Sequence, residues 1–185
     1  MTKFYEIEPN LENYWRSIIL FGRNVASYKF ALAKSLYDLK DSGDTFIPLD
    51  KLAVPFAKHI SEHLIICDKQ GTSKNSPFLN ACRDFNADKI SHSQLIEKTV
   101  RQGFINVIDA FHNVHNSEVP TRFYVDERKT KGGIILTDDF FELGEQFQYC
   151  NLADETEARW RLVETAWELN LPKHLIQING VRKFI

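Results

Sequence analysis

The stretch from Leu11 to Leu39 constrains the fold more than any other part of the sequence, because it contains no proline and only Gly22 to weaken a helix. Asn10, directly before it, is a preferred N-cap residue. Apolar side chains such as Trp15 recur around most of its circumference, which is typical of a helix buried against several others. We therefore expect one long helix over 11–39 as the spine of the fold.

Helix signals recur along the rest of the chain. Ser76-Pro77 has the form of an N-cap followed by the first helical residue, and Gly103 is placed to end a helix that starts at Ser91 or Ser93. The predicted helices cover 50–67, 77–86, 91–103, 105–112, a short segment from Asp138 or Asp139, and 154–169.

One segment has the pattern of a β-hairpin. Val125 and the apolar run 134–136 flank the basic, glycine-rich tip 131–133, which predicts a hairpin inserted near residues 121–137. A small C-terminal hairpin that turns at Asn179-Gly180 is predicted over 174–185. The expected fold class is mainly α: a single compact multi-helix domain over 1–185 that carries these hairpins.

The totals for the chain bear on its compartment and partners. Its 185 residues carry a formal net charge of -2 and three cysteines, an odd number that argues against a disulfide framework. No run of about 18 apolar residues and no secretory signal pattern is present, so we expect a cytoplasmic protein with no membrane association. The net charge excludes the global basic excess of many nucleic-acid binders, so such binding would need local clusters.

A metal site is one alternative that the sequence leaves open. His59 and His63 match the H-x-x-E-H pattern of a class of zinc peptidases, and Cys67 continues the same helix face. No downstream ligand follows at a recognisable spacing, and a partly exposed structural helix face explains the pattern as well. A metal-dependent hydrolase therefore stays an alternative, and our prediction names no metal ligand and no cofactor.

A second catalytic alternative lies on the predicted hairpin, where Glu127 and Lys129 alternate onto one face and Asp109 lies upstream. One broad nuclease class uses two carboxylates and a lysine to hold magnesium and polarise water. That class builds its site on a central sheet, which a helical chain lacks, so a solvated hairpin rim is the competing interpretation. No Gly-x-Ser-x-Gly and no Walker-type loop occurs, and no catalytic residue is predicted.

Positive charge is clustered in three places: the first helix, the polar loop 69–74 and the hairpin. On one continuous helix, Arg16, Arg23 and Lys34 would fall within a narrow sector together with Ser27. The loop leads into a helix N-terminus, which favours an anion such as phosphate. Elements that share a face would grip a phosphate backbone without reading bases. The predicted nucleic-acid-binding residues are Arg16, Arg23, Lys34, Lys69, Thr72, Ser73, Lys74, Arg122, Arg128, Lys129 and Lys131.

The competing interpretation makes the basic stripe internal. Arg16 and Arg23 would then pair with carboxylates such as Glu142 or Glu164, and the loop lysines would only be solvated. In that case the chain would be a protein-interaction or oligomerisation module without nucleic-acid binding.

Six segments carry a resemblance to a known family: LENYWR at 11–16, LFGRNVASYKFALAK at 20–34, DKQGTS at 68–73, NVIDAFH at 106–112, RFYVD at 122–126 and LVETAWEL at 162–169. Together they resemble the N-terminal, non-nuclease region of a family of bacterial HNH endonucleases. The resemblance implies that an HNH nuclease module follows this region in the family. Neither the His-Asn-His constellation nor paired Cys-x-x-Cys motifs occur in these 185 residues, so the resemblance implies no cleavage by this polypeptide alone.

The resemblance and the charge distribution together predict an accessory or recognition module of an HNH-nuclease-type system concerned with defence or restriction. The expected partners are nucleic acid, with DNA as the expected type, and a nuclease module or partner subunit.

Overall fold

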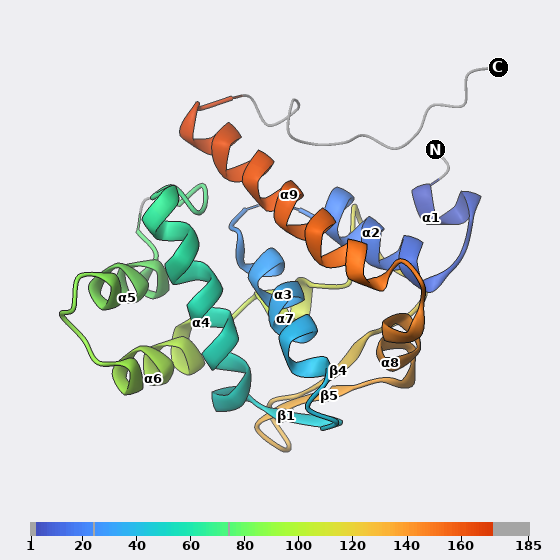
Figure 1. Cartoon of the computed structure of the whole chain (residues 1–185), viewed down its shortest axis with the longest axis horizontal. Helices are drawn as coiled ribbons and strands as arrows, with labels where there is room; N and C mark the ends of the chain where they lie inside the picture. The colour runs from blue at the N-terminus through green and yellow to red at the C-terminus, as the bar shows by residue number, and fades with distance from the viewer. Residues whose placement is uncertain (1–2, 24, 74, 172–185) are drawn as a thin grey trace.

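A long helix, α4 (Leu49–Ile66), runs through the middle of the protein and divides its other elements into two groups (Figure 1). The structure is a computed structural model that describes residues 3–23, 25–73 and 75–171. On one side of α4 pack α5 (Pro77–Asn86) and α6 (His92–Gln102), and on the other packs α3 (Tyr28–Lys40). The remaining elements are α1 (Phe4–Ile7), α2 (Leu11–Phe21), β1 (Phe46–Pro48), α7 (Val107–Ala110), β2 (Asn113–Val114), β3 (Ser117–Glu118), β4 (Tyr124–Glu127), β5 (Gly133–Leu136), α8 (Asp138–Glu145) and α9 (Tyr149–Glu168).

The predicted mainly α class with an inserted hairpin is confirmed. β4 and β5 pair antiparallel across the predicted tip, where Gly132 has a φ of 76° that suits glycine. The sequence did not reveal a third strand: β1, directly before α4, pairs with the outer edge of β5 and ties the hairpin to the N-terminal end of α4. The predicted hairpin over 174–185 lies outside the described residues.

The prediction of one helix over 11–39 is wrong, because the chain breaks between α2 and α3. The connecting segment pairs instead with the loop that follows α4: the Thr72 amide donates to Val25 O at 2.9 Å, and the Ser27 amide donates to Gln70 O at 3.0 Å. Tertiary hydrogen bonds thus take up backbone groups that a continuous helix would have used.

Lys29 stabilises this break from inside the protein. Its buried Nζ donates to Gly22 O at 2.7 Å and to Ile18 O at 3.0 Å, which satisfies carbonyl groups at the C-terminal end of α2. Burial, and secondarily the charge of Arg159, lowers the pKa of Lys29 well below its usual value. A side chain at Gly22 would not fit here, since its Cβ would lie 2.5 Å from the backbone oxygen of Ile18.

Trp15 lies at the centre of the aromatic core and is fully buried. The centroid of its ring lies 5.0 Å from that of Phe123 and 5.6 Å from that of Phe111, both in edge-on arrangements. The ring centroids of Tyr37 and Phe140 lie 5.2 and 5.9 Å away. These partners come from α3, α8 and the segments beside α7 and β4. The Trp15 side chain therefore joins several elements on the side of α4 that faces away from α5 and α6. α9, which begins five residues before the predicted Asp154, covers α2 and α3 (Figure 1).

None of the helices in the described part of the chain is long and apolar enough to cross a membrane.

His112 is a buried neutral histidine in the same core. The Phe123 amide donates to its Nε2 at 3.0 Å, so the ring proton is assigned to Nδ1. Burial, and to a lesser degree the charge of Arg122, lowers the pKa of His112 to about 3.

His112 therefore makes the fold acid-sensitive. An unfolded histidine has a pKa of about 6.5, so between about pH 6.5 and 3 the unfolded state binds the extra proton and stability falls as pH falls, by at most about 1.4 kcal/mol per unit. We expect His112→Gln, which keeps an acceptor but does not titrate, to flatten this slope in urea unfolding measured from about pH 7 to about pH 4. His92→Gln, at an exposed site, should keep the wild-type slope. An unchanged slope in His112→Gln would contradict the assignment.

Candidate functional site

The two histidines of α4 lie on one face, as their spacing predicts, but both are engaged by carboxylates. His59 Nε2 is 2.7 Å from Asp38, and His63 is 2.9 Å from Glu164 at Nδ1 and 3.2 Å from Glu157 at Nε2. Among the residues that the structure describes, no group of three or more His, Cys, Asp or Glu side chains has the arrangement of a metal site. The geometry therefore gives the zinc-hydrolase alternative no support.

His63, Gln70, Trp160 and Glu164 form a closed ring of contacts, which we call the buried tetrad. Trp160 Nε1 donates to Gln70 Oε1 at 2.9 Å, Gln70 Nε2 donates to Glu164 Oε2 at 2.6 Å, and the same oxygen contacts His63 Nδ1. The ring closes because the His63 imidazole stacks on Trp160 at 3.5 Å between centroids. Cys67, the third member of the predicted metal stripe, places its Sγ 3.8 Å from the backbone oxygens of Lys69 and Glu164.

Charges of both signs surround His63. A neutral imidazole has one donor and one acceptor, so hydrogen bonds from both nitrogens to Glu157 and Glu164 require a protonated ring or a protonated carboxyl. Burial raises the pKa of Glu157, but the hydrogen bond from Lys34 at 2.5 Å and the charges of His63 and Lys34 outweigh it and lower the pKa to about 2. Arg161 contacts Glu164 Oε1 at 3.1 Å. The arrangement thus places the His63 ring between two carboxylates.

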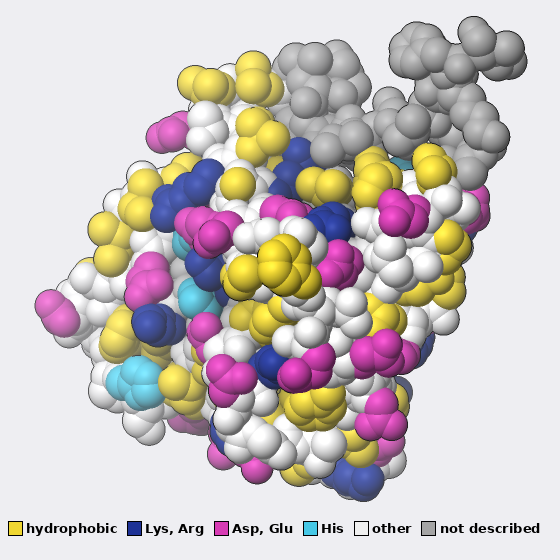
Figure 2. Space-filling model, turned by 45° about the vertical axis from the view of Figure 1, so that its right-hand side comes forward, with side chains coloured by type: hydrophobic (Ala, Val, Ile, Leu, Met, Phe, Trp, Pro, Cys, Tyr) yellow, Lys and Arg dark blue, Asp and Glu magenta, His cyan; other side chains and the backbone are white. Residues whose placement is uncertain are grey.

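The face formed by α3, α4 and α9 shows this mixture of charges at its surface. In Figure 2, cyan histidine surface appears among dark blue and magenta side chains on the left of the view. The tetrad itself is closed to solvent, since none of its four side chains belongs to a residue more than 3% exposed. It can hold elements together, but it cannot meet a substrate.

Gln70 connects the tetrad to the two paired loops. Its side chain belongs to the tetrad, and its backbone carbonyl accepts the Ser27 amide. An isolated antiparallel bridge joins Ala26 to Gly71 between the same loops. Arg23, Lys69, Thr72 and Ser73 are exposed on these loops, and we call these four residues the loop platform.

The predicted basic stripe does not exist as a surface, because it assumed a continuous helix. Arg16 donates to Glu155 at 2.8 and 3.0 Å, and Lys34 pairs with Glu157. Ser27 is buried. Only Arg23 of this set is exposed without a partner in the described residues. The internal pairing expected for Arg16 occurs, but with Glu155 instead of the predicted Glu142 or Glu164.

On the hairpin, Arg128 is held by protein groups. It contacts Asp126 at 2.7 Å, Asp109 at 2.6 Å and Phe104 O at 2.8 Å, and the Asp126 hydrogen bond is the first cause that raises its pKa. Arg128 therefore occupies Asp109, one of the two carboxylates with which the nuclease alternative would hold a metal. Glu127 accepts a hydrogen bond from Thr130.

The other hairpin cations differ in their partners. Arg122 pairs with Glu118 at 2.5 Å, whereas Lys129 and Lys131 are exposed and have no partner in the described ranges 3–23, 25–73 and 75–171. Lys74 lies outside the described residues.

The three predicted basic elements do not share one face. The hairpin lies at the N-terminal end of α4, where the Leu49 amide donates to Gly132 O at 3.0 Å, while the loop platform lies beyond its C-terminal end (Figure 1). The 18 residues of α4 separate these ends by about 27 Å. A bound nucleic acid would have to span this length to contact both the hairpin and the loop platform.

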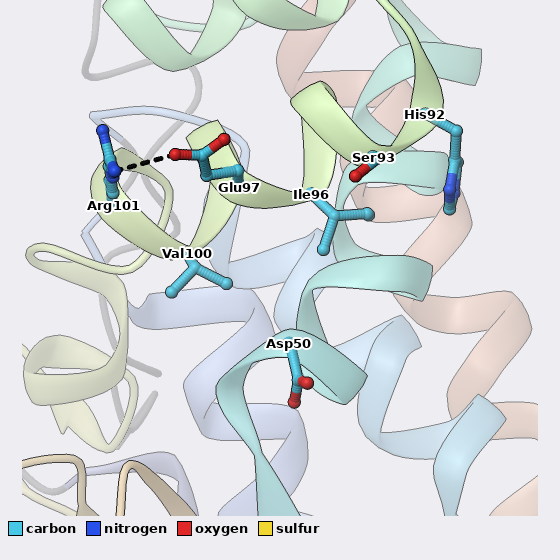
Figure 3. A pocket seen from close by; sticks show the side chains of 7 residues that line it. All are labelled: Asp50, His92, Ser93, Ile96, Glu97, Val100 and Arg101. Atoms are coloured by element: carbon cyan, nitrogen blue, oxygen red, sulfur yellow. Dashed lines mark ion pairs between the residues drawn. The ribbon is translucent and has the colours of Figure 1, made fainter.

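An open groove lies between the first turn of α4 and α6 (Figure 3). Ile96 and Val100 give it an apolar wall, Asp50 faces it from α4, and Arg101 pairs with Glu97 at 2.7 Å. The groove contains none of the predicted binding residues, and no contact within it indicates a ligand class.

Sequence reasoning missed the role of Gln70 and named Glu164 only as an ion-pair partner. Gln70 lies in a polar loop with no periodic pattern that would mark it as buried. Glu164 gave a usable signal: it follows Trp160 by one helical turn, on the same apolar stripe as Val163 and Trp167, where a carboxylate must have partners.

The tetrad predicts that two glutamates of α9 differ in importance. We expect Glu164→Gln to lower the free energy of unfolding by about 1–3 kcal/mol, because the carboxylate contacts Gln70, Arg161 and His63 and the amide that replaces it leaves a buried donor without an acceptor. Glu155→Gln removes an exposed ion pair with Arg16 and should cost less than about 1 kcal/mol. Urea unfolding of both variants checks this, and equal effects would show that the tetrad is not a buried ionic unit.

The chain matches no protein-family model, and neither the curated proteins nor the solved structures contain a significant match to it.

Proposed function

We propose that this chain is a recognition module without its own catalytic site, belonging to an HNH-nuclease-type system, and that it contacts nucleic-acid backbone through the loop platform. One observation carries the proposal. Arg16, Lys34, Arg122 and Arg128 are paired with carboxylates. Within the described residues, Lys129, Lys131 and the two platform cations are not, and the platform cations are carried by two loops that hydrogen bonds join.

The platform has the chemistry that a phosphate backbone requires. Arg23 has no partner within the described chain, and Lys69 donates only to a neutral amide oxygen, Asn170 Oδ1, at 2.6 Å. Thr72 and Ser73 are exposed on the same loop as Lys69, but their hydroxyl groups donate to Val25 O at 3.2 Å and Asn75 O at 3.3 Å. Guanidinium and ammonium groups are typical contacts to a phosphate backbone and carry no base preference. The resemblance to HNH-endonuclease proteins supports the same assignment.

The salt dependence of binding tests the proposal. Each phosphate contact that is lost lowers the slope of log K against log salt by about 0.9 for duplex DNA and about 0.7 for a single strand. We expect Arg23→Ala/Lys69→Ala to reduce the duplex slope by about 1.8 in fluorescence anisotropy titrations with labelled oligonucleotides.

Lys129→Ala/Lys131→Ala is the matched control, because it removes the same charge from the opposite end of α4. It should leave the slope unchanged. Equal loss of slope in both double variants, or a wild-type protein that shows no salt-sensitive binding to either strand form, would refute the proposal.

A second candidate function, an oligomerisation module, is favoured by exposed aliphatic side chains at the ends of α4 and α9. Ile65 is 73% exposed, Ile66 64% and Leu162 57%. The two helix ends lie side by side, since Cys67 Sγ is 3.8 Å from Glu164 O. Aliphatic side chains gathered in this way are a typical interface feature.

Sedimentation equilibrium over a range of protein concentrations tests this second function. If a second copy covers these side chains, the wild-type protein is a concentration-dependent oligomer and Ile66→Ser/Leu162→Ser is a monomer that keeps the wild-type affinity for oligonucleotide. A wild-type protein that stays monomeric throughout would exclude the oligomerisation module.

A further inference from the structure

Gln70 makes two sets of hydrogen bonds that point in opposite directions. Its side chain is 1% exposed: Oε1 accepts from Trp160 Nε1 at 2.9 Å, while Nε2 donates to Glu164 Oε2 at 2.6 Å and to Cys67 O at 3.0 Å. Its backbone carbonyl points to the other loop and accepts from the Ser27 amide at 3.0 Å and the Ser27 hydroxyl at 3.3 Å. One residue therefore joins α9 to the pairing of the two loops.

The loops are in close contact directly beside Gln70. Thr72 donates its amide and its hydroxyl to Val25 O at 2.9 and 3.2 Å. Between these contacts, a Cβ at Gly71 would lie 3.1 Å from Val25 O and 3.3 Å from Ala26 Cβ, so the absence of a side chain permits the close approach.

We infer that Gln70 is a positioning residue for the loop platform: through the buried tetrad it fixes the relative position of the two loops that carry Arg23 and Lys69. The consequence for binding rests on the proposed function, whereas the consequence for loop order does not. A platform fixed before binding does not have to lose loop entropy when a ligand binds, and this raises its affinity.

Positioning and direct contact have different signatures. Removing a platform cation lowers both the affinity and the salt slope, because fewer ions are released. Loosening the platform leaves every cation in place, so the slope stays while the affinity falls at all salt concentrations. This difference separates a positioning role for Gln70 from a contact role.

Hydrogen exchange measured by NMR tests the effect on loop order. Gln70→Met keeps the length of the side chain but removes its hydrogen bonds to Trp160 and Glu164. We expect the Ser27 and Thr72 amides, which carry the loop pairing, to exchange about tenfold faster or more, while the amides of α6 keep their wild-type rates.

Anisotropy titrations with the same labelled duplex test the effect on binding. We expect Gln70→Met to bind about tenfold more weakly than the wild type, with the wild-type salt slope. A reduced slope would make Gln70 a direct contact and overturn the inference. If the wild-type protein itself does not bind, the proposed function fails, while the exchange measurement still decides whether Gln70 positions the loops.

Trp160→Phe is a second variant for the same exchange measurement, needed if Gln70→Met destabilises the whole protein. It removes one donor to Gln70 but keeps an aromatic ring beside His63. Faster exchange confined to Ser27 and Thr72 in Trp160→Phe would support the inference. Unchanged exchange of these two amides in both variants, or uniform acceleration across the chain in both, would overturn it.

Discussion

A single buried carboxylate, that of Glu164, organises the junction of α4, α9 and the loop after α4. It accepts hydrogen bonds from Gln70 and Arg161 and contacts His63, so its charge is compensated although Glu164 is only 2% exposed. A buried charge is tolerated only when it is fully paired in this way. The orientation of each partner is therefore constrained, and the loop that carries Gln70 takes its position from α9.

The same constraint explains why the first long helical stretch is broken. The tetrad holds Gln70, whose backbone carbonyl accepts a hydrogen bond from the Ser27 amide. Two residues after Gln70, the Thr72 amide donates to Val25 O. Val25 O and the Ser27 amide find their hydrogen-bond partners in this pairing, and Lys29 satisfies the carbonyl groups at the end of α2. The loop after α4, the break between α2 and α3 and the Lys29 contacts at the end of α2 thus form one unit. This unit carries the cations of the loop platform.

Local signals in the sequence predicted the elements whose ends depend on local chemistry. Ser76 and Ser91 cap α5 and α6 as expected, and the hairpin forms around its glycine-rich tip. The break at Gly22 and the pairing of β1 with β5 could not be predicted, because both depend on residues distant in sequence. The predicted basic stripe is absent for the same reason: the prediction assumed one helix over 11–39, and tertiary contacts divide this stretch into α2 and α3. His59 and His63 share a face as predicted, but only the fold reveals that Asp38 and Glu164 face them.

The exchange of the Trp160 indole proton tests this view of the junction most directly. Trp160 Nε1 donates to Gln70 Oε1 at 2.9 Å inside a tetrad that is closed to solvent. Hydrogen exchange followed by NMR should therefore show strong protection of this proton in the wild-type protein and much weaker protection in Glu164→Gln. Exchange at the rate of an exposed indole in the wild-type protein would contradict a closed tetrad that holds the platform in place.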